Sequence, residues 1–396
     1  MNSVYINFAE VLYLDKIIYL DNSSTTAPCE TAVKRINEAL CERWGNPSSL
    51  HILGMEAENA VFDARKKIAK LLSCREDELY FTSGGTESNN TAIFGAAKAG
   101  KKRGNRIVTT SVEHPSVLEA MKRLEAEGFE VVYIKPQQNG SVSPADIEAA
   151  VDKNTVLVSI MLVNNETGAI QPVDKCREII KKKSAPALLH CDAVQAFGKM
   201  PVNVSALGID MLSISGHKIH GPKGIGTLYI KKGVAVQPFI VGGGQERGFR
   251  SGTESVPLIM GLGGAVEALP DIKSQLDKMI ELKAYTTEKL LSTGLITVNS
   301  PENGLPYILN VSLNGYRSET LLHFLESKNI FVSSGSACAK GKGSYVLREM
   351  GLSADLADSA LRISFSRYNT KADADALAKE IKSAAETLVR KGRTVR

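Results

Sequence analysis

Two segments carry residues whose chemistry is complementary. Lys218 lies in SISGHKIHGPKGIG (213–226) and Asp192 lies in HCDAVQAFGK (190–199), each directly after a short apolar run typical of a strand. A lysine amine forms a Schiff base with an aldehyde, and a carboxylate keeps a pyridine nitrogen protonated. Either residue alone has an ordinary interpretation, a surface lysine or a helix cap. Together they match what pyridoxal phosphate requires.

A third segment, TSGGTESNN (82–90), is suited to a phosphate group. Gly84 and Gly85 allow the backbone to approach a ligand closely, and Thr86 opens a predicted helix whose first N–H groups would face an anion. Such a turn also occurs as a plain helix cap, so it is weak evidence by itself. Ser215 and His217, beside the lysine, would add further donors to the same phosphate.

Cys338 lies in SSGSACAKGKGS (333–344), which offers almost nothing to bury. It is either an accidental surface thiol or a reactive sulfur on a flexible loop. Lys340 and Lys342 would favour its thiolate, or would only keep an exposed loop in solution. The chain has no CxxC pair and no His/Cys cluster at metal spacing, which predicts no metal site. The other five cysteines fall in helical or strand patterns and are predicted to be packing residues: Cys29, Cys41, Cys74, Cys176 and Cys191.

The elements that position these residues alternate along the chain. Amphipathic helices are predicted at 57–72, 115–128 and 174–183. Short β-branched runs predict strands at 78–82, 106–110, 130–134, 155–163, 187–191, 210–214 and 226–230. This alternation predicts a mainly parallel sheet covered on both faces, with ligands at the carboxyl ends of its strands, where the lysine and the acid lie.

After Gly264 the pattern changes. A long charged helix (about 271–293) precedes a shorter mixture of strands and helices, which predicts a smaller α+β unit. We therefore expect an N-terminal segment (1–26) that packs with the small domain, a large cofactor-binding domain (27–265), and a small C-terminal domain (266–396) that carries the cysteine loop.

The composition is that of an ordinary globular protein, and its charge is weak evidence for any particular partner. Hydrophobic residues make up 43% and charged residues 23%, and the net charge of +5 is spread along the chain. No apolar run reaches the length of about 18 residues that a membrane helix needs. The first fifteen residues carry no basic start of an export signal. We expect a cytoplasmic protein with reduced thiols, no membrane contact and no direct nucleic-acid partner.

The sequence resembles the NifS/IscS-type cysteine desulfurases of the class V aminotransferase family, which are fold type I enzymes dependent on pyridoxal phosphate. The resemblance extends over nearly the whole chain from Ile17 and rests on a series of blocks in the family's order. These blocks are YLDNSSTT (19–26), GNPSSLH (45–51), TSGGTESNN (82–90), EHPSVL (113–118), VNNETG (163–168), HCDAVQAFGK (190–199), SISGHKIHGPKGIG (213–226), GGGQERGFRSGTES (242–255), SSGSAC (333–338) and LRIS (361–364).

The resemblance implies a role for each matching catalytic residue. Lys218 would form the Schiff base, and His114 would stack on the cofactor ring and shuttle protons. Cys338 would attack the substrate sulfur and leave as a persulfide. It implies no metal ligands, although Cys338 would contact an iron–sulfur cluster if it delivered sulfur to one. Arg362 would clamp the substrate carboxylate, with Asn165 beside it.

The resemblance also implies the cofactor contacts. Asp192 would pair with the ring nitrogen, while Gln195 and Asn165 would hold the side of the ring that bears the hydroxyl group. Thr253 would reach the phosphate of the partner subunit, so the active unit would be a homodimer. The phosphate of the chain's own cofactor would be bound by Gly85, Thr86, Ser215, Gly216 and His217.

The implied activity converts L-cysteine to L-alanine and passes the sulfur to an acceptor, such as an iron–sulfur scaffold or a tRNA-thiolation enzyme. Three alternatives remain open. They are a selenocysteine lyase, a class V aminotransferase, which has no use for a loop cysteine, and a non-catalytic scaffold. Two departures from the family, DNSSTT in the first block and a slightly shorter loop after Cys338, bear on which acceptor takes the sulfur.

Overall fold

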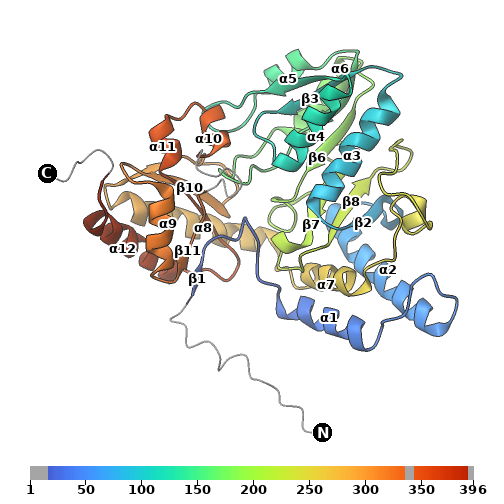
Figure 1. The fold of residues 1–396 in the computed structure, drawn as a ribbon, viewed down its shortest axis with the longest axis horizontal. Helices are drawn as coiled ribbons and strands as arrows, with labels where there is room; N and C mark the ends of the chain where they lie inside the picture. Colours follow the sequence, from blue (N-terminus) through green and yellow to red (C-terminus); the bar gives the residue numbers. More distant parts are fainter. Residues whose placement is uncertain (1–16, 335–342, 391–396) are drawn as a thin grey trace, which may run out of the picture.

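A computed structural model describes residues 17–334 and 343–390. The chain forms a larger part around a seven-stranded sheet and a smaller part that includes the long helix α8 (Ile272–Leu291) (Figure 1). Within the described residues, no helix is both long and apolar enough to cross a membrane.

The large sheet is mainly parallel, as predicted. Only β2 and β8 introduce antiparallel pairs, β2 with β8 and β8 with β7. Its strands, in spatial order, are β2 (Leu79–Thr82), β8 (Gly226–Ile230), β7 (Met211–Ser215), β6 (Leu188–Asp192), β5 (Thr155–Ser159), β3 (Arg106–Thr110) and β4 (Glu130–Ile134).

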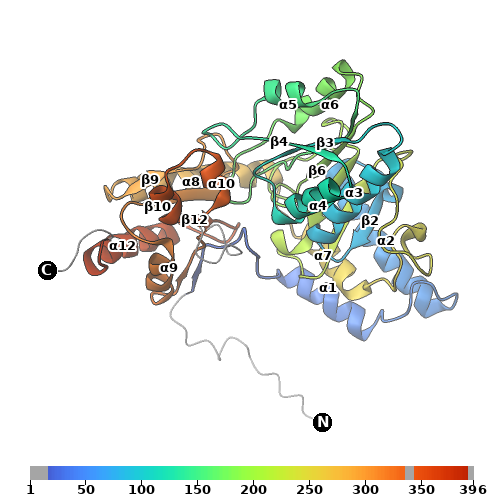
Figure 2. The same ribbon diagram turned by 45° about the horizontal axis from the view of Figure 1, so that its top comes forward.

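Helices cover both faces of this sheet because the apolar side chains of its strands point alternately to either side. In β3, Ile107 packs toward α3 (Gly85–Gly100) and α4 (Pro115–Ala126), whereas Val108 packs into the core on the opposite face (Figure 2). Within the larger part, the helices that contribute to that second core are α1 (Glu30–Cys41), α2 (Ile52–Leu72), α5 (Pro144–Ala150), α6 (Val173–Lys182) and α7 (Val256–Glu267).

One predicted strand is shorter than expected. The apolar run 155–163 is a regular strand only to Ser159. The amides of Ile160 and Leu162 still donate to β6, but the amide of Met161 donates to the buried Glu113 carboxylate instead. The regular pairing of β5 with β3 therefore ends at Ser159.

The smaller part is an α+β unit, as predicted. Its antiparallel sheet has the order β12 (Ala360–Ser364), β10 (Ile308–Leu313), β9 (Ile296–Val298). The helix α12 (Lys371–Thr387) packs with both α8 and α9 (Ser318–Glu326), and two short helices, α10 (Tyr345–Glu349) and α11 (Ala354–Asp358), face the larger part.

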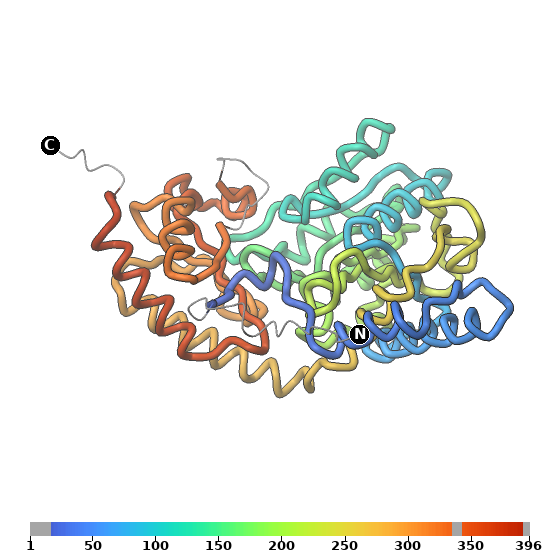
Figure 3. The backbone as a smooth tube through the Cα atoms, turned by 60° about the horizontal axis from the view of Figure 1, so that its bottom comes forward, coloured from blue at the N-terminus to red at the C-terminus, as the bar shows by residue number. Residues whose placement is uncertain are grey.

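The N-terminal segment joins the two parts. β1 (Ile18–Tyr19) pairs in parallel with β11 (Ile330–Phe331) of the smaller part, and the chain then crosses to α1 of the larger part (Figure 3). The expected domain boundaries at 26/27 and 265/266 stay a prediction.

Candidate active site

A cavity of about 660 Å³ lies where β5, β6 and β7 end. The loop after β1, the start of α3, the residues before α4 and Arg362 of β12 complete its walls. This is the position at which open α/β sheets bind ligands, at the carboxyl ends of their parallel strands.

Lys218 follows β7 in a single turn of 3-10 helix and points into the cavity. Its Nζ donates to the carbonyl oxygen of Ser23 and, at 2.8 Å, to that of Ser24. Burial and the positive charge of Arg362 lower the pKa of this amine to about 8, although two nearby carboxylates oppose the shift. The fraction of neutral, nucleophilic amine near pH 7 is therefore much larger than for an exposed lysine.

Asp192 ends β6, and only 6% of it is exposed. Its Oδ2 accepts from Asn89 Nδ2 at 2.7 Å, and its Oδ1 accepts from the backbone N–H of Val194 at 3.0 Å. Hydrogen bonds from two donors hold the carboxylate in one orientation. The cavity therefore contains a fixed negative charge beside Lys218.

The N-terminus of α3 forms the end of the cavity suited to an anion. Gly84 precedes it with a φ of +152°, which a side chain would strain, and a Cβ on Gly85 would lie 2.8 Å from Val194 Cγ2. Free N–H groups and the helix dipole make this position favourable for phosphate. Three side chains line the cavity beside it: Thr86, Ser215 and His217.

Arg362 closes the opposite end and is 3% exposed. Its Nη1 donates to the carbonyl oxygen of Asn165 at 3.1 Å, and its Nη2 donates to Asp21 Oδ1 at 2.8 Å. Nη2 also donates to Ser24 Oγ at 2.6 Å. The buried Nε has no hydrogen-bond partner among the described residues. The guanidinium group is thus held in one orientation and keeps a donor for a carboxylate.

His114 precedes α4 and lines the cavity. Its Nδ1 accepts from the backbone N–H of Ser116 at 3.2 Å, so the neutral imidazole carries its proton on Nε2. Desolvation lowers the pKa of this ring; the Asp192 carboxylate opposes the shift and the Lys218 amine adds to it. The ring is therefore mainly neutral at pH 7 and able to accept a proton.

The structure brings most of the predicted site residues together. Gly216 lies behind the wall, where its amide donates to the Ile225 carbonyl oxygen at 3.0 Å. Thr253 is exposed and outside the cavity, and Cys338 lies outside the described residues. The predicted residues that line the cavity are Gly85, Thr86, His114, Asn165, Asp192, Gln195, Ser215, His217, Lys218 and Arg362.

Four residues that hold the charged groups of the site were not assigned a role from the sequence. Asn89 orients the acid, whereas Ser23 and Ser24 hold the lysine amine and Asp21 holds the arginine. All four lie in the quoted blocks YLDNSSTT and TSGGTESNN. The sequence feature that could have indicated them is a polar run without an obvious turn function. The carbonyl groups of Ser23 and Ser24 could not be predicted in this way, because any residue type has a backbone carbonyl.

The prediction that five cysteines are packing residues is wrong for Cys41, which is exposed. It falls at the end of α1, whose buried face carries Ala32 and Ala39. Cys74 is half-buried, and burial raises the pKa of the Cys74 and Cys176 thiols to about 12. The packing prediction is confirmed for the three buried cysteines, Cys29, Cys176 and Cys191.

Comparisons with known proteins agree with this site. The family described as Aminotransferase class-V matches residues 18–377. The chain is 42% identical over 365 residues to a protein named cysteine desulfurase IscS from Methanosarcina thermophila, which covers 91% of this chain and 90% of that protein. A solved structure described as a NifS-like protein superposes with a TM-score of 0.89 at 39% identity, over 94% of this chain and 100% of that one. A second, described as SspA in complex with cysteine, gives a TM-score of 0.79 at 35% identity, over 89% of this chain and 100% of that one.

The chain therefore belongs to the class-V aminotransferase family, with the fold type I architecture predicted from the sequence. Within that family it is a pyridoxal-phosphate-dependent cysteine desulfurase.

The residues present fit this cofactor. The cavity offers an acid for the ring nitrogen, an amine for the aldehyde and a helix N-terminus for the phosphate, and it is large enough to take an amino acid as well. Two buried amide oxygens, Asn89 Oδ1 and Asn165 Oδ1, have no hydrogen-bond partner among the described residues. Unpaired buried polar atoms are costly, so a bound polar group would be stabilised by pairing with them.

Proposed function

We propose that this desulfurase removes sulfur from L-cysteine with Lys218, His114, Asp192 and Arg362, and carries it on Cys338 as a persulfide to an acceptor protein. The observation that carries the proposal is that the Lys218 amine, the Asp192 carboxylate and the Arg362 guanidinium group line one cavity. Pyridoxal phosphate, when bound, supplies the electron sink that weakens the bonds around the Cα atom of the amino acid.

Lys218 and His114 would divide the proton transfers. The low pKa of Lys218, about 8, favours the neutral amine that must be available to accept the Cα proton. His114 has its proton on Nε2 and its Nδ1 fixed by Ser116, so it is placed to exchange a second proton with the substrate or cofactor.

Arg362 would select the substrate by its carboxylate. Three hydrogen bonds fix the guanidinium group, so little side-chain freedom is lost when substrate binds. Asn165, whose carbonyl accepts one of these bonds and whose side chain lines the cavity, would complete the clamp.

Sulfur transfer requires an acceptor thiolate. The Cys338 thiolate would attack the substrate sulfur and form an S–S bond while the Cβ–S bond breaks. The electron pair of that bond stays on carbon, which takes up a proton to give alanine. Persulfide is left on the cysteine, and no external oxidant is required.

We propose that the active unit is a homodimer in which Thr253 reaches the partner's cofactor phosphate. Exposed apolar side chains support this, because single exposed residues are common but a group of them marks an interface. Leu50 is 98% exposed and Val241 is 79% exposed, and Ile52 and Phe62 of α2 are more than half exposed. A buried ion pair between α2 and the loop before Thr253, Arg65–Glu246, keeps these segments together.

The proposed setting is cytoplasmic, with an iron–sulfur scaffold or a tRNA-thiolation enzyme as acceptor. The five described cysteines are all unpaired, which supports a reducing compartment.

The test is mass spectrometry after a single turnover with L-cysteine. We expect a sulfur adduct of about 32 Da on the peptide that contains Cys338. Cys338→Ser should bind cofactor and cysteine but should form neither the adduct nor alanine, since a hydroxyl group cannot form a persulfide. An adduct on Cys41, the exposed control thiol, together with full activity of Cys338→Ser, would assign sulfur transfer to another residue.

A further inference from the structure

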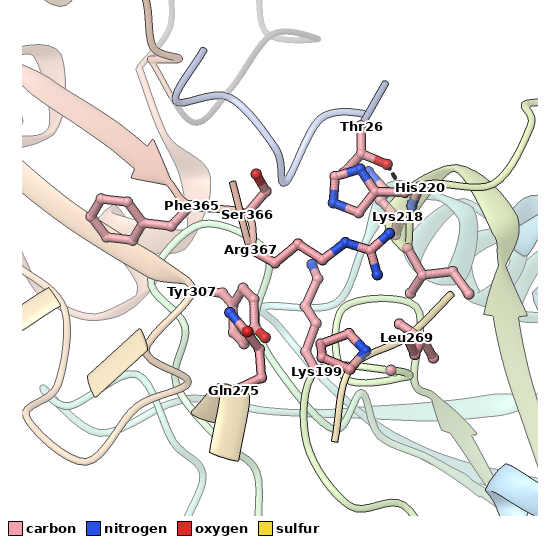
Figure 4. Close-up of a pocket in the computed structure, with 13 residues that line it drawn as sticks. Thr26, Lys199, Lys218, His220, Leu269, Gln275, Tyr307, Phe365, Ser366 and Arg367 are labelled. Carbon is pink, nitrogen blue, oxygen red and sulfur yellow. Dashed lines mark hydrogen bonds between the residues drawn. The ribbon is translucent and has the colours of Figure 1, made fainter. Parts of the chain in front are cut away.

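Lys199 is a buried charged group for which the proposed mechanism has no role. It lies in the turn after β6, and only 6% of it is exposed. Its side chain enters a second, smaller cavity, which Lys218 also lines (Figure 4). None of the thirteen described residues around that cavity carries a carboxylate. Burial, with the positive charges of Lys218 and Arg362, lowers the pKa of the Lys199 amine to about 7.

The second cavity is too small to be a ligand site. Its free volume is about 20 Å³, which is enough for about one water molecule. We therefore infer the function of the Lys199 amine from its hydrogen bond within the protein and not from a bound ligand. Nζ lies 3.1 Å from Oε1 of Gln195, which lines the cofactor cavity.

This contact fixes the orientation of a side chain that could otherwise turn over. A glutamine amide presents an acceptor on one side and two donors on the other. A charged lysine amine donates hydrogen bonds and cannot accept them. With Oε1 bound to Lys199, the Gln195 Nε2 donates to the carbonyl oxygen of Ser23 at 2.9 Å and keeps its second proton. The reversed amide would place two donors against each other. The same Ser23 carbonyl accepts from Lys218.

We propose that Lys199 is a positioning residue for the cofactor ring, because it holds the Gln195 amide with its N–H side toward Ser23 and the cofactor cavity. Gln195 can then donate to the ring hydroxyl group without first reorienting. The inference rests on the proposed role of Gln195 as a ring contact and adds the residue that prepares it.

A double-mutant cycle tests the inference through cofactor affinity. The dissociation constant of pyridoxal phosphate is measured by titrating the apo-protein of the parent, Lys199→Met, Gln195→Met and the double variant. We expect each single substitution to weaken binding about tenfold, the size of one hydrogen bond to a charged or polar partner. The double variant should bind no more weakly than Gln195→Met, because Lys199 acts through Gln195.

Two controls separate positioning from general destabilisation. Lys283→Met replaces a half-buried lysine, whose Nζ donates to the Pro301 carbonyl oxygen at 3.4 Å, and should leave the dissociation constant unchanged. Lys199→Arg retains a donor-only group and should restore binding to within a few-fold of the parent. The Lys199→Arg variant therefore tests the inference even if Lys199→Met does not fold.

The possible failures can be told apart. If Gln195→Met binds the cofactor as the parent does, the proposed role of Gln195 is wrong and the inference is lost with it. If Gln195→Met is weakened but Lys199→Met is not, or if the two losses multiply in the double variant, Gln195 keeps its role and the inference is overturned. A tenfold loss in Lys199→Arg would also overturn it.

Discussion

Replacing Asp192 by asparagine removes the negative charge proposed to face the ring nitrogen while keeping its shape. The Val194 amide should keep its acceptor, the side-chain oxygen. The new amide nitrogen would meet the donor Nδ2 of Asn89, now 2.7 Å from the carboxylate. Asn89 Oδ1 has no partner in the described part of the chain, so its amide can turn over and accept instead, at the expense of the hydrogen bond that Asn89 Nδ2 donates to Ser116 Oγ at 2.9 Å. We therefore expect Asp192→Asn to fold.

The two consequences of Asp192→Asn differ in size. Exchanging a hydrogen bond to a charged acceptor for a neutral one should reduce the free energy of unfolding of the apo-protein by about 1 kcal/mol. Removing one fixed electrostatic contributor from a water-excluded site should lower kcat by about 10²–10³-fold. Loss of activity should therefore far exceed what the loss of stability explains.

The assay is alanine formation at saturating L-cysteine and pyridoxal phosphate, together with thermal unfolding of the apo-protein. Asp210→Asn is the matched control. Asp210 is 5% exposed, bonds to Arg177 and to the Leu189 amide, and does not line the cavity. It should lose stability but keep kcat. If Asp192→Asn retained the parental kcat with cofactor bound, the proposed role of the acid would be refuted.

Three further predictions concern the amine and the guanidinium group. Lys218→Ala should lose the absorbance band of the lysine-bound cofactor and all turnover, and alanine release at the parental rate would show that another amine carries the cofactor. Because the pKa of Lys218 is about 8 and only the neutral amine attacks an aldehyde, the rate at which apo-protein captures pyridoxal phosphate should rise through about pH 8 and level off above it; a rate independent of pH from 6 to 10 would contradict this. Arg362→Lys should raise KM for L-cysteine about 10²-fold by losing the fork geometry, whereas Arg367→Lys, outside the cofactor cavity, should not.

The positions of the strands and helices were the part of the fold that could best be predicted from the sequence. Strand residues with β-branched side chains on both faces have one stable environment, a sheet covered on two sides, and β3, β4 and β8 begin and end where their apolar runs do. The prediction of a strand over the whole run 155–163 was wrong because Glu113 interrupts it. This residue is distant in sequence and is buried beside Met161. Long-range contacts of this kind are not encoded in the periodicity of the segment they interrupt.

The residues of the candidate site also divide into those that could be predicted from the sequence and those that could not. Lys218 and Asp192 could be predicted only as a pair, because each alone is equally well explained as a surface lysine or a helix cap, whereas an amine and an acid directly after two strands match one cofactor. Asn89 could not, since an asparagine on the first turns of a helix has many interpretations until its partner is known. The hydrogen bond between Lys199 and Gln195 follows from one helical turn of spacing, but its meaning depends on which cavity each residue faces.

The short segment after β1 links the two ends of the site. Ser24 accepts from Lys218 through its carbonyl and from Arg362 through its hydroxyl group, while Ser23 accepts from Lys218 and Gln195. The lysine belongs to the larger part of the molecule and the arginine to the smaller part, so their relative position depends on these few residues. A shift of this segment would change the distance between the Lys218 amine, proposed to hold the cofactor, and the Arg362 guanidinium group, proposed to hold the substrate carboxylate. Since misplacement by about 1 Å can cost about 10²-fold in rate, we expect disruption of the pairing between β1 and β11 to lower activity as well as stability.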